Sequence, residues 1–303
     1  FEINVARFLV CSLHPAPARP SQAGGDGHLQ PGKYLLGKAE KRMPSSQHDS
    51  ERRFGGIRRL YGEAGLQRFR AAHVCVIGIG GVGSWTAEAL ARSGIGQLTL
   101  IDMDHVAESN INRQLHALSG TLGQAKVQAM AERIRQINPD CRIDCIEEFI
   151  SADNLADLLG RGYDHVVDCI DGFRVKAALI AWCRRNRIRL VTVGGAGGQT
   201  DPTRIRIADL SNTEHDALFS KTRKLLRSDY GFPRNLKRRF DVPCVYSDEQ
   251  PLFPAADGGV CHEKPQRPVA GLNCAGGLGS ATTVTASFGL AAASQVLKKL
   301  TMK

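Results

Sequence analysis

Short apolar runs alternate with longer amphipathic segments from about residue 74 onwards. Strands are expected near residues 74–78, 97–102, 141–147, 164–170 and 188–193, and helices near residues 82–93, 124–137, 152–159 and 174–186. Alternation of strands and helices with short links is typical of a parallel sheet covered by helices. The pattern therefore predicts an α/β fold with a doubly wound, mostly parallel sheet.

The segments flanking this core follow other patterns. Residues 52–73 read as an N-terminal helical arm, residues 203–209 alternate like a strand, residues 210–272 look irregular and basic, and residues 281–300 form a helix of small and apolar residues. The hydrophobicity of this last helix is modest for a membrane span, so we expect it to pack against the sheet. We therefore divide the chain into a nucleotide-binding core, residues 51–209, and a basic lid with a C-terminal packing helix, residues 210–303.

Residues 1–50 differ in composition from the rest and are rich in Pro, Ala, Gly, Ser and Gln. Such a segment cannot bury enough surface to offset its ordering entropy, so we expect disorder. Its apolar run, residues 8–11, is too brief for the core of a signal peptide. Translation starting at Met43 is the alternative to a functional extension, and it would make the upstream residues a gene-model artefact.

A glycine-rich turn follows the first strand and contains Gly78, Gly80, Gly81 and Gly83. A strand, such a turn and a helix form a phosphate cradle, because glycines let the backbone approach the anion and the helix N-terminus offers free N–H groups. Asp102 lies about 20 residues further on, with Asp104 close behind, where a carboxylate can hold ribose hydroxyls. These features predict a bound nucleotide, but they suit a nicotinamide dehydrogenase equally well.

Three further residues, Asn110, Arg113 and Lys126, favour ATP. Adenylate transfer needs cations such as Arg113 and Lys126, because negative charge builds on the α-phosphate while pyrophosphate leaves. A carboxylate for Mg²⁺ is also expected, and Asp171 ends a strand-like run at the place where open parallel sheets bind ligands. A nicotinamide-dependent oxidoreductase or a non-catalytic binding module would leave all these residues unexplained.

Together these residues resemble the adenylating family that includes ubiquitin-activating enzymes and the bacterial HesA/MoeB/ThiF proteins, over residues 52–207. By motif position, the resemblance places Gly81 in the ATP loop, Asp102 on the ribose, Asn110 and Arg113 on the phosphates, Lys126 on the phosphates and leaving group, and Asp171 on the metal. It implies a Rossmann-like fold that binds ATP and Mg²⁺ at the carboxyl ends of the strands.

The resemblance also implies a homodimer, in which an arginine from the partner's N-terminal arm reaches the site. Arg59 is the best match for this arginine. Arg53 and Arg58 remain alternatives, because the spacing departs from the family's usual Arg-aromatic-x-Arg.

Three flanking motifs, residues 54–62, 242–251 and 279–289, narrow the resemblance to the branch that dehydrates threonylcarbamoyladenosine beside the anticodon of tRNA. That branch implies ATP-dependent adenylation of the threonyl carboxylate, ring closure by a nitrogen of the same substituent, and release of AMP. The alternative is an adenylyltransferase for a ubiquitin-like sulfur-carrier protein, which shares every ATP residue.

The net charge of +10 suggests a polyanionic partner, and the charge is concentrated between residues 220 and 240. Eight bases lie there, opposed only by Asp229: Lys221, Arg223, Lys224, Arg227, Arg234, Lys237, Arg238 and Arg239. We predict that they contact tRNA, mostly through its phosphates, the alternative being a solvated basic helix and loop. Interleaved aromatic residues, Tyr230, Phe232 and Phe240, could stack on bases.

The chain has nine cysteines and no C-x-x-C pair. The structural zinc that some relatives hold on two such pairs is therefore not expected, and so many unpaired thiols suit a reducing cytoplasm. Cys244 is read as structural or site-lining in preference to a nucleophile. The resemblance further hints at a cysteine desulfurase system as a partner, and at peripheral membrane association as a less favoured alternative to a purely cytoplasmic location.

Overall fold

The structure is a computed structural model that describes residues 46–255, 257–263 and 278–302. The expectations for residues 1–45, including disorder and a start at Met43, lie outside these ranges. Helix α1 begins at Ser46, so residues 46–50 are helical and the expectation of disorder is wrong for them. Arg70 donates a hydrogen bond of 2.9 Å to the Ser50 hydroxyl, which ties this first turn to the end of α1.

Seven strands form one sheet in the order β3-β2-β1-β4-β5-β7-β6, which confirms the predicted α/β class. Their bounds are His73–Ile77 (β1), Gln97–Ile101 (β2), Arg142–Ile146 (β3), His165–Asp168 (β4), Leu190–Val193 (β5), Ile205–Asp209 (β6) and Pro243–Ser247 (β7). Neighbouring strands are parallel except β6 and β7, which are antiparallel. Two short strands, β8 (Phe253–Pro254) and β9 (Val260–Cys261), pair separately.

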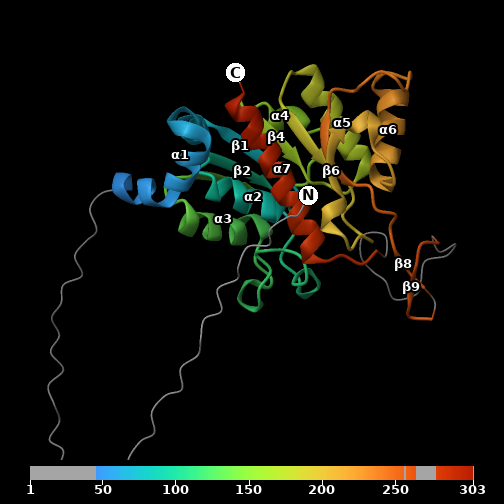
Figure 1. Cartoon of the computed structure of the whole chain (residues 1–303), viewed down its shortest axis with the longest axis horizontal. Coiled ribbons are helices and arrows are strands. Elements are labelled where there is room, and N and C mark those ends of the chain that lie inside the picture. The colour runs from blue at the N-terminus through green and yellow to red at the C-terminus, as the bar shows by residue number, and fades with distance from the viewer. Residues whose placement is uncertain (1–45, 256, 264–277, 303) are drawn as a thin grey trace, which may run out of the picture. The chain divides into compact units, whose positions relative to one another are not determined.

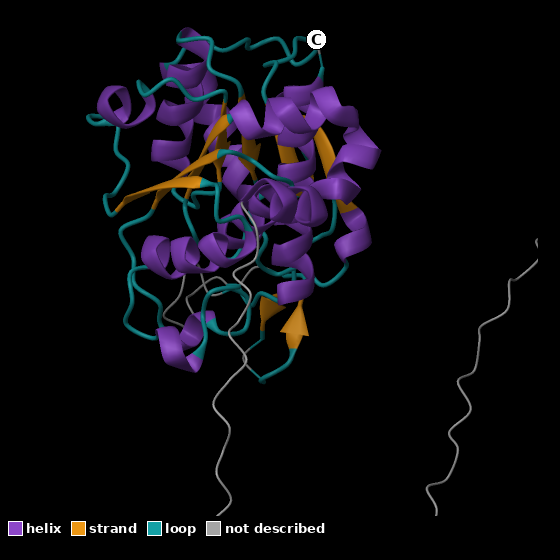
Figure 2. Cartoon of the chain, turned by 90° about the vertical axis from the view of Figure 1, so that its left-hand side faces the viewer, coloured by secondary structure: helices purple, strands orange, loops and turns teal. Residues whose placement is uncertain are grey.

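Helices cover both faces of the sheet (Figure 1, Figure 2). Their bounds are Ser46–Ala71 (α1), Gly83–Arg92 (α2), Lys126–Ile137 (α3), Leu155–Leu159 (α4), Phe173–Arg185 (α5), Ala217–Asp229 (α6) and Thr282–Thr301 (α7). Short 3₁₀ turns lie at Glu108–Asn110, Ser119–Thr121, Pro202–Arg204 and Leu210–Asn212.

Strand β1 shows how one run of residues serves two cores. Val74 and Val76 pack in the cluster formed with α1, α2, α3 and α7. Cys75 and Ile77 pack in the other cluster, formed with α4, α5 and α6. Side chains alternate between faces along a strand, so a strand covered on both sides is apolar at every position.

Helix α7 lies directly against α2 (Figure 1). A Cβ built on Gly289 would lie 2.6 Å from the Val82 carbonyl oxygen, so only glycine allows this approach. The Thr86 hydroxyl donates to the Gly289 carbonyl across the contact. The predicted C-terminal packing helix is therefore confirmed. Among the helices of the described ranges, none combines the length and the apolar character needed to cross a membrane.

The segment 210–272 is more regular than expected, since its described part contains α6 and β7. Asp216 caps α6 by accepting the Phe219 N–H, and Phe219, Thr222 and Leu226 form its buried stripe. Many basic residues interrupt this stripe in the sequence and hide the helical period. Strand β7 pairs with both β5 and β6, so residues from both sides of the predicted boundary at 209 share one sheet. The division at 209 stays a prediction about function.

The sheet order defines where a ligand should bind. Strand β1 lies between β2 and β4, and the chain proceeds in opposite directions along the sheet after β1 and after β4. Open α/β sheets bind ligands at the carboxyl ends of the strands at such a point. The glycine turn follows β1 and Asp171 follows β4, so the fold brings both to this crevice.

Candidate nucleotide site and basic surface

The glycine turn between β1 and α2 is tight because neighbouring backbone atoms leave no room for a side chain at two of its positions. Gly78 has a φ of +84°, and a Cβ there would lie 3.0 Å from the Cys169 carbonyl oxygen. A Cβ on Gly83 would lie only 1.8 Å from the Gly78 carbonyl oxygen. At Gly80 the nearest protein atom would be 3.9 Å away, so packing does not demand glycine there. This leaves open backbone that a phosphate can approach.

Asp102 lies against this turn, as the sequence predicted. Its carboxylate accepts the Ile79 N–H at 2.6 Å and the Asp104 N–H at 2.8 Å. Burial raises the pKa of Asp102, against the opposing effect of the Lys126 charge and of these two hydrogen bonds. The carboxylate is therefore held beside the glycine turn, where it can accept hydrogen bonds from ribose hydroxyls.

Lys126 opens helix α3 and reaches back to the segment that follows β2. Its ammonium lies 2.6 Å from the Asp104 carboxylate, and its backbone N–H donates to the Asp104 carbonyl. Lys126 also influences the pKa of Asp102, so these three residues form one electrostatic group at the end of β2.

Arg113 lies beside the glycine turn, although some 30 residues separate it from Gly81 in the chain. A Cβ on Gly81 would meet the Arg113 side chain at 3.3 Å. The Arg113 guanidinium donates to the Ser109 carbonyl at 2.8 Å and to the Asn112 amide oxygen at 2.9 Å. These contacts fix a cation next to the predicted phosphate cradle.

Asn110 is buried, and its amide oxygen accepts the Ala107 N–H at 3.0 Å. Its amide nitrogen has no hydrogen-bond partner among the described residues, so its N–H groups stay available as donors. Donors of this kind suit phosphate oxygens.

The C-terminal helix supports the turn that carries Arg113, a role the sequence did not suggest. Asn112 donates to the Ser280 carbonyl at 2.8 Å, and the Thr282 hydroxyl donates to the Asn112 carbonyl. The Arg113 carbonyl accepts from Trp85 of α2 and from Thr285 of α7. Helix α7 therefore holds the cationic turn against α2.

Asp171 lies three residues beyond the end of β4 and is exposed. It has no hydrogen bond or ion pair with the described residues. No group of three or more Asp, Glu, His or Cys side chains suited to a metal lies in the described ranges. Mg²⁺ in nucleotide sites is usually held by one or two carboxylates together with phosphate oxygens and water. A lone free carboxylate at this position fits that mode.

Two buried polar residues near the site escaped the sequence analysis. The Gln114 amide oxygen and both ring nitrogens of His116 are buried without a hydrogen-bond partner in the described structure. Burial, together with the nearby Lys126 charge, lowers the pKa of His116 to about 4, so the ring is neutral at pH 7. Their position directly after Arg113 was the only signal in the sequence.

Arg59 is exposed on α1 and has no hydrogen bond or ion pair within the described structure. The two alternatives are engaged by their own chain. Arg53 donates to the Gln136 and Ile137 carbonyls at the end of α3. Arg58 lies 3.5 Å from Glu51 and 3.9 Å from Glu63. The structure does not bring Arg59 to the glycine turn of its own chain.

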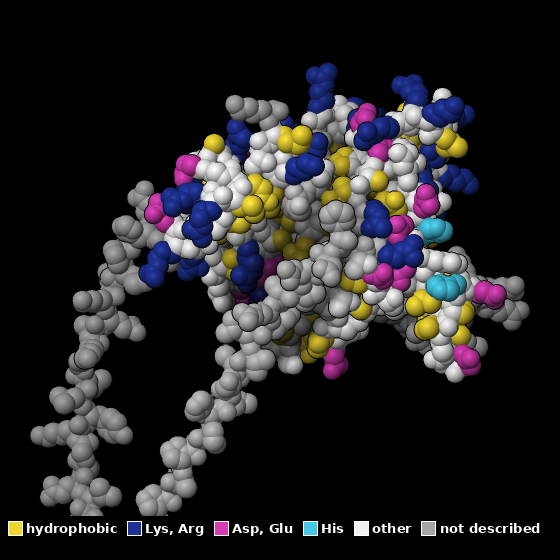
Figure 3. Space-filling model, in the orientation of Figure 1, with side chains coloured by type: hydrophobic (Ala, Val, Ile, Leu, Met, Phe, Trp, Pro, Cys, Tyr) yellow, Lys and Arg dark blue, Asp and Glu magenta, His cyan; other side chains and the backbone are white. Residues whose placement is uncertain are grey.

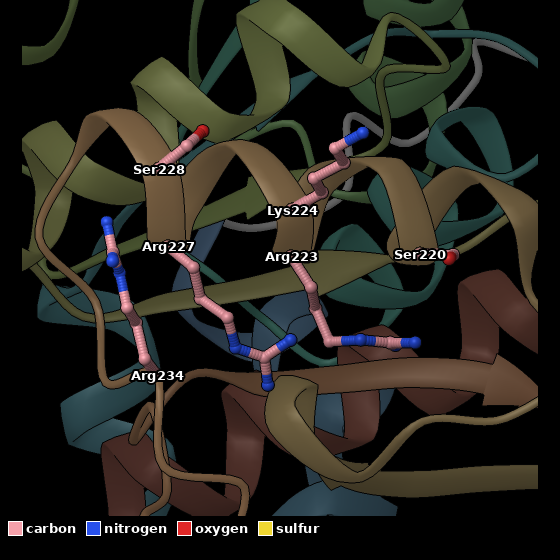
Figure 4. A pocket seen from close by; sticks show the side chains of 6 residues that line it. All are labelled: Ser220, Arg223, Lys224, Arg227, Ser228 and Arg234. Atoms are coloured by element: carbon pink, nitrogen blue, oxygen red, sulfur yellow. The ribbon is translucent and has the colours of Figure 1, made fainter.

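Basic side chains gather around α6 (Figure 3). Four of the eight predicted bases line one open cavity of about 450 Å³, which is shown in Figure 4. Its lining residues are Ser220, Arg223, Lys224, Arg227, Ser228 and Arg234. Burial and the neighbouring Arg227 charge lower the pKa of Arg223. None of these four cations forms an ion pair with the described residues, so the cavity has a positive potential suited to an anion.

The other four predicted bases lie outside this cavity. Lys221 lies over the Phe173 ring at 5.4 Å, and Arg239 lies 3.7 Å from Asp209. Lys237 and Arg238 are exposed. The expectation that Phe240 stacks on bases is wrong, because its ring is fully buried and packs edge-to-face against Phe232.

Cys244 lies inside the sheet and not in a loop. It is fully buried in β7, and its thiol donates to the Ala208 carbonyl at 3.4 Å. Burial strongly raises its pKa, so the reactive thiolate is disfavoured. This environment supports a structural role.

Comparison with known proteins identifies the family to which the chain belongs. The model of the ThiF family matches residues 55–303. A protein of Haemophilus influenzae named tRNA threonylcarbamoyladenosine dehydratase is 55% identical over 253 residues, which are 84% of this chain and 95% of that protein. A protein of the same name from Escherichia coli is 55% identical over 256 residues, 83% of this chain and 94% of that protein.

A crystal structure of the Escherichia coli dehydratase TcdA in complex with ATP is similar with a TM-score of 0.74 at 52% identity, covering 82% of this chain and 94% of that chain. A molybdopterin-synthase adenylyltransferase from Salmonella typhimurium is more distant, at 34% identity over 42% of this chain and 51% of that protein.

Proposed function

The chain belongs to the ThiF family, and we propose that it is an ATP-dependent enzyme that dehydrates threonylcarbamoyladenosine in tRNA to the cyclic form. The observation that carries this conclusion is the 55% identity to dehydratases of which the chain covers 94–95%. The grouping of Asp102, Arg113 and Lys126 around the glycine turn supports it. The molybdopterin-synthase adenylyltransferase matches a much smaller share of the chain.

The reaction activates a carboxylate and then closes a ring. A threonyl carboxylate oxygen attacks the α-phosphorus of ATP, and the bond to pyrophosphate breaks. A nitrogen of the same substituent then attacks the acyl carbon, loses its proton, and expels AMP. The net change in the nucleoside is the loss of one water.

The polar and cationic residues of the site have separate tasks in this proposal. Arg113 and Asn110 bind phosphate oxygens beside the glycine turn of Gly78, Gly80, Gly81 and Gly83, where the backbone at Gly80 is open to a ligand. Lys126 neutralises the charge that develops on the α-phosphate and on the leaving pyrophosphate. Fixed donors and cations stabilise such charge best, because they need no reorganisation during the reaction.

Asp171 holds the Mg²⁺ that accompanies ATP. This assignment is supported by the position of Asp171, whose free and exposed carboxylate lies at the carboxyl end of β4, next to the glycine turn. With ATP bound, Mg²⁺ would neutralise phosphate charge at this position. Asp104 belongs to the nucleotide site through its ion pair with Lys126.

The basic surface binds the tRNA. The four bases of the cavity, Arg223, Lys224, Arg227 and Arg234, face an anion site, and Lys237 and Arg238 extend it along the following loop. Lys221 and Arg239 belong to the same surface, although each has a partner in the chain. Contacts of this kind go mainly to phosphates and so carry little sequence information.

The active form is a homodimer in which Arg59 reaches the partner's site. The support is that Arg59 is exposed and unpaired among the described residues, whereas Arg53 and Arg58 contact their own chain. A cysteine desulfurase system and a cytoplasmic location stay predictions of the resemblance. The buried Cys244 plays no part in the proposed reaction.

Mass spectrometry of nucleosides tests the function directly. Purified protein is incubated with ATP, magnesium and tRNA that contains threonylcarbamoyladenosine. We expect ATP-dependent loss of the mass of one water from that nucleoside. No mass shift, together with pyrophosphate exchange that a sulfur-carrier protein stimulates and tRNA does not, would point to the carrier adenylyltransferase instead.

A further inference from the structure

Close to Asp171 in the chain lies a buried ion pair that the sequence did not reveal. Asp168 is the last residue of β4 and Lys176 belongs to α5, and both side chains are fully buried. The Lys176 ammonium lies 2.7 Å from one Asp168 carboxylate oxygen, Oδ2. An aspartate and a lysine inside otherwise apolar segments were its only trace in the sequence.

A third residue completes the group. The Thr192 hydroxyl of β5 donates to the same Asp168 oxygen at 2.6 Å and accepts from Lys176 at 3.2 Å. The Asp168 side chain is therefore fixed by donors from two different elements, α5 and β5. Such a carboxylate has one orientation, because any rotation would leave buried charges without partners.

The second Asp168 oxygen, Oδ1, holds the turn that follows β4. It accepts the Ile170 N–H at 3.1 Å, one residue before Asp171. The turn is also joined to β1 through the Cys169 N–H, which donates to the Ile77 carbonyl at 2.9 Å. Asp171 itself forms no hydrogen bond or ion pair with the described residues that would orient it. Its position depends on how the turn before it is held.

We propose that Asp168, fixed by Lys176 and Thr192, is a positioning residue that anchors the turn 169–171 and so presents Asp171 to magnesium-bound ATP. The inference rests on the proposed function of Asp171. Stability alone does not account for the group, because a buried ion pair adds little compared with apolar residues of similar size. Groups that orient a metal-binding side chain typically change metal affinity about 10- to 100-fold when they are removed.

Two double variants distinguish the effect of anchoring the turn 169–171 from the effect of removing the buried charges. D168L/K176M removes both charges and the acceptor for the Ile170 N–H, whereas D168N/K176M removes both charges and keeps an oxygen that can accept it. Neither leaves a lone buried charge. ATP affinity is measured by calorimetry with magnesium and with EDTA, and the fold is checked by circular dichroism and thermal unfolding.

We expect D168L/K176M to lose about tenfold or more in affinity for ATP with magnesium, with ATP affinity in EDTA unchanged. D168N/K176M should keep most of the magnesium effect. A folded D168L/K176M that binds magnesium-ATP as the wild type does would overturn the proposal, and so would equal losses in both variants.

If the double variants do not fold, a pair of less disruptive single variants at Thr192 tests the same proposal. T192V removes one donor to Asp168 without changing the side-chain shape, and T192S keeps it. We expect a smaller loss of the magnesium effect in T192V alone, and identical behaviour of T192V, T192S and wild type would reject the inference. A wild type without any magnesium effect on ATP affinity would reject it too, whereas the proposed function is judged separately by the dehydration of tRNA.

Discussion

The ammonium of Lys126 lies 2.6 Å from the carboxylate of Asp104, and the two side chains differ sharply in exposure, at 7% for Lys126 and 58% for Asp104. The ammonium of Lys126 is thus largely shielded from solvent at the start of α3, while the Asp104 carboxylate remains accessible to solvent. An ion pair with one solvated partner can exchange that partner for phosphate oxygens without leaving a charge buried. This arrangement suits a lysine that must meet a growing negative charge.

The first prediction concerns the two site cations. Lys126→Ala or Arg113→Ala should slow adenylation by roughly a thousandfold, because each loses a charge-assisted contact worth several kcal/mol in the transition state. Pyrophosphate exchange measures the rate, and circular dichroism should show an unchanged fold. Lys298→Ala, at the end of α7, is the matched control. Wild-type turnover in either site variant would refute the role given to that residue.

The second prediction separates two glycines of one turn. In Gly83→Ala the new methyl group would lie 1.8 Å from the Gly78 carbonyl oxygen, so we expect a loss of stability of about 2 kcal/mol or more. In Gly80→Ala the nearest protein atom is 3.9 Å away, so the fold should survive while ATP binding weakens. Urea unfolding and ATP titration measure both effects. Equal stability of the two variants would contradict the packing argument.

The third prediction concerns the basic surface. Reversal of Lys237, Arg238 and Arg239 to Glu should weaken tRNA binding and flatten its dependence on salt, because fewer counterions are released. K224E/R234E in the cavity should act in the same way. ATP binding should stay intact in both. R135E/R142E, on α3 and β3 at the opposite edge of the sheet, is the control that matches the charge change of K224E/R234E. Tight tRNA binding by either surface variant would show that the residues substituted in that variant do not contact the RNA.

The fourth prediction is acid destabilisation through buried histidines. Burial lowers the pKa of His116 and of His165 to about 4, below the ordinary value of 6.5. Between these two values the unfolded chain binds more protons than the folded chain, so the free energy of unfolding decreases as the pH falls from 6.5 to 4. Each histidine contributes up to about 3 kcal/mol to this loss.

Urea unfolding at several pH values between 7 and 4 tests this prediction. His165→Leu should flatten the dependence on pH, whereas the same change at the exposed His105 should leave it as it is. An unchanged slope in His165→Leu would show that other groups cause the acid sensitivity.

The fifth prediction concerns Cys244. Since its thiol is buried and its pKa is raised, Cys244→Ala should retain dehydration activity and lose stability by about 1 kcal/mol. The native protein should react slowly with thiol reagents at this position. Loss of activity in a folded Cys244→Ala would return sulfur or thioester chemistry to consideration.

The sequence by itself determined the class of the fold and half of the nucleotide site. The alternation of strands and helices requires a covered parallel sheet, and the glycine turn with Asp102 lies within one continuous β-α-β stretch. In such a stretch local geometry already fixes which residues meet, because the turn and the next strand end share one edge of the sheet.

Only the tertiary structure decided what supports these residues. The contact of Asn112 with Ser280 joins positions 168 residues apart, and β7 enters the sheet between β5 and β6. The Asp168–Lys176 pair and the burial of Cys244 likewise depend on packing between elements. Local propensity cannot encode such pairings, because the free energy that selects them arises when distant surfaces leave water together.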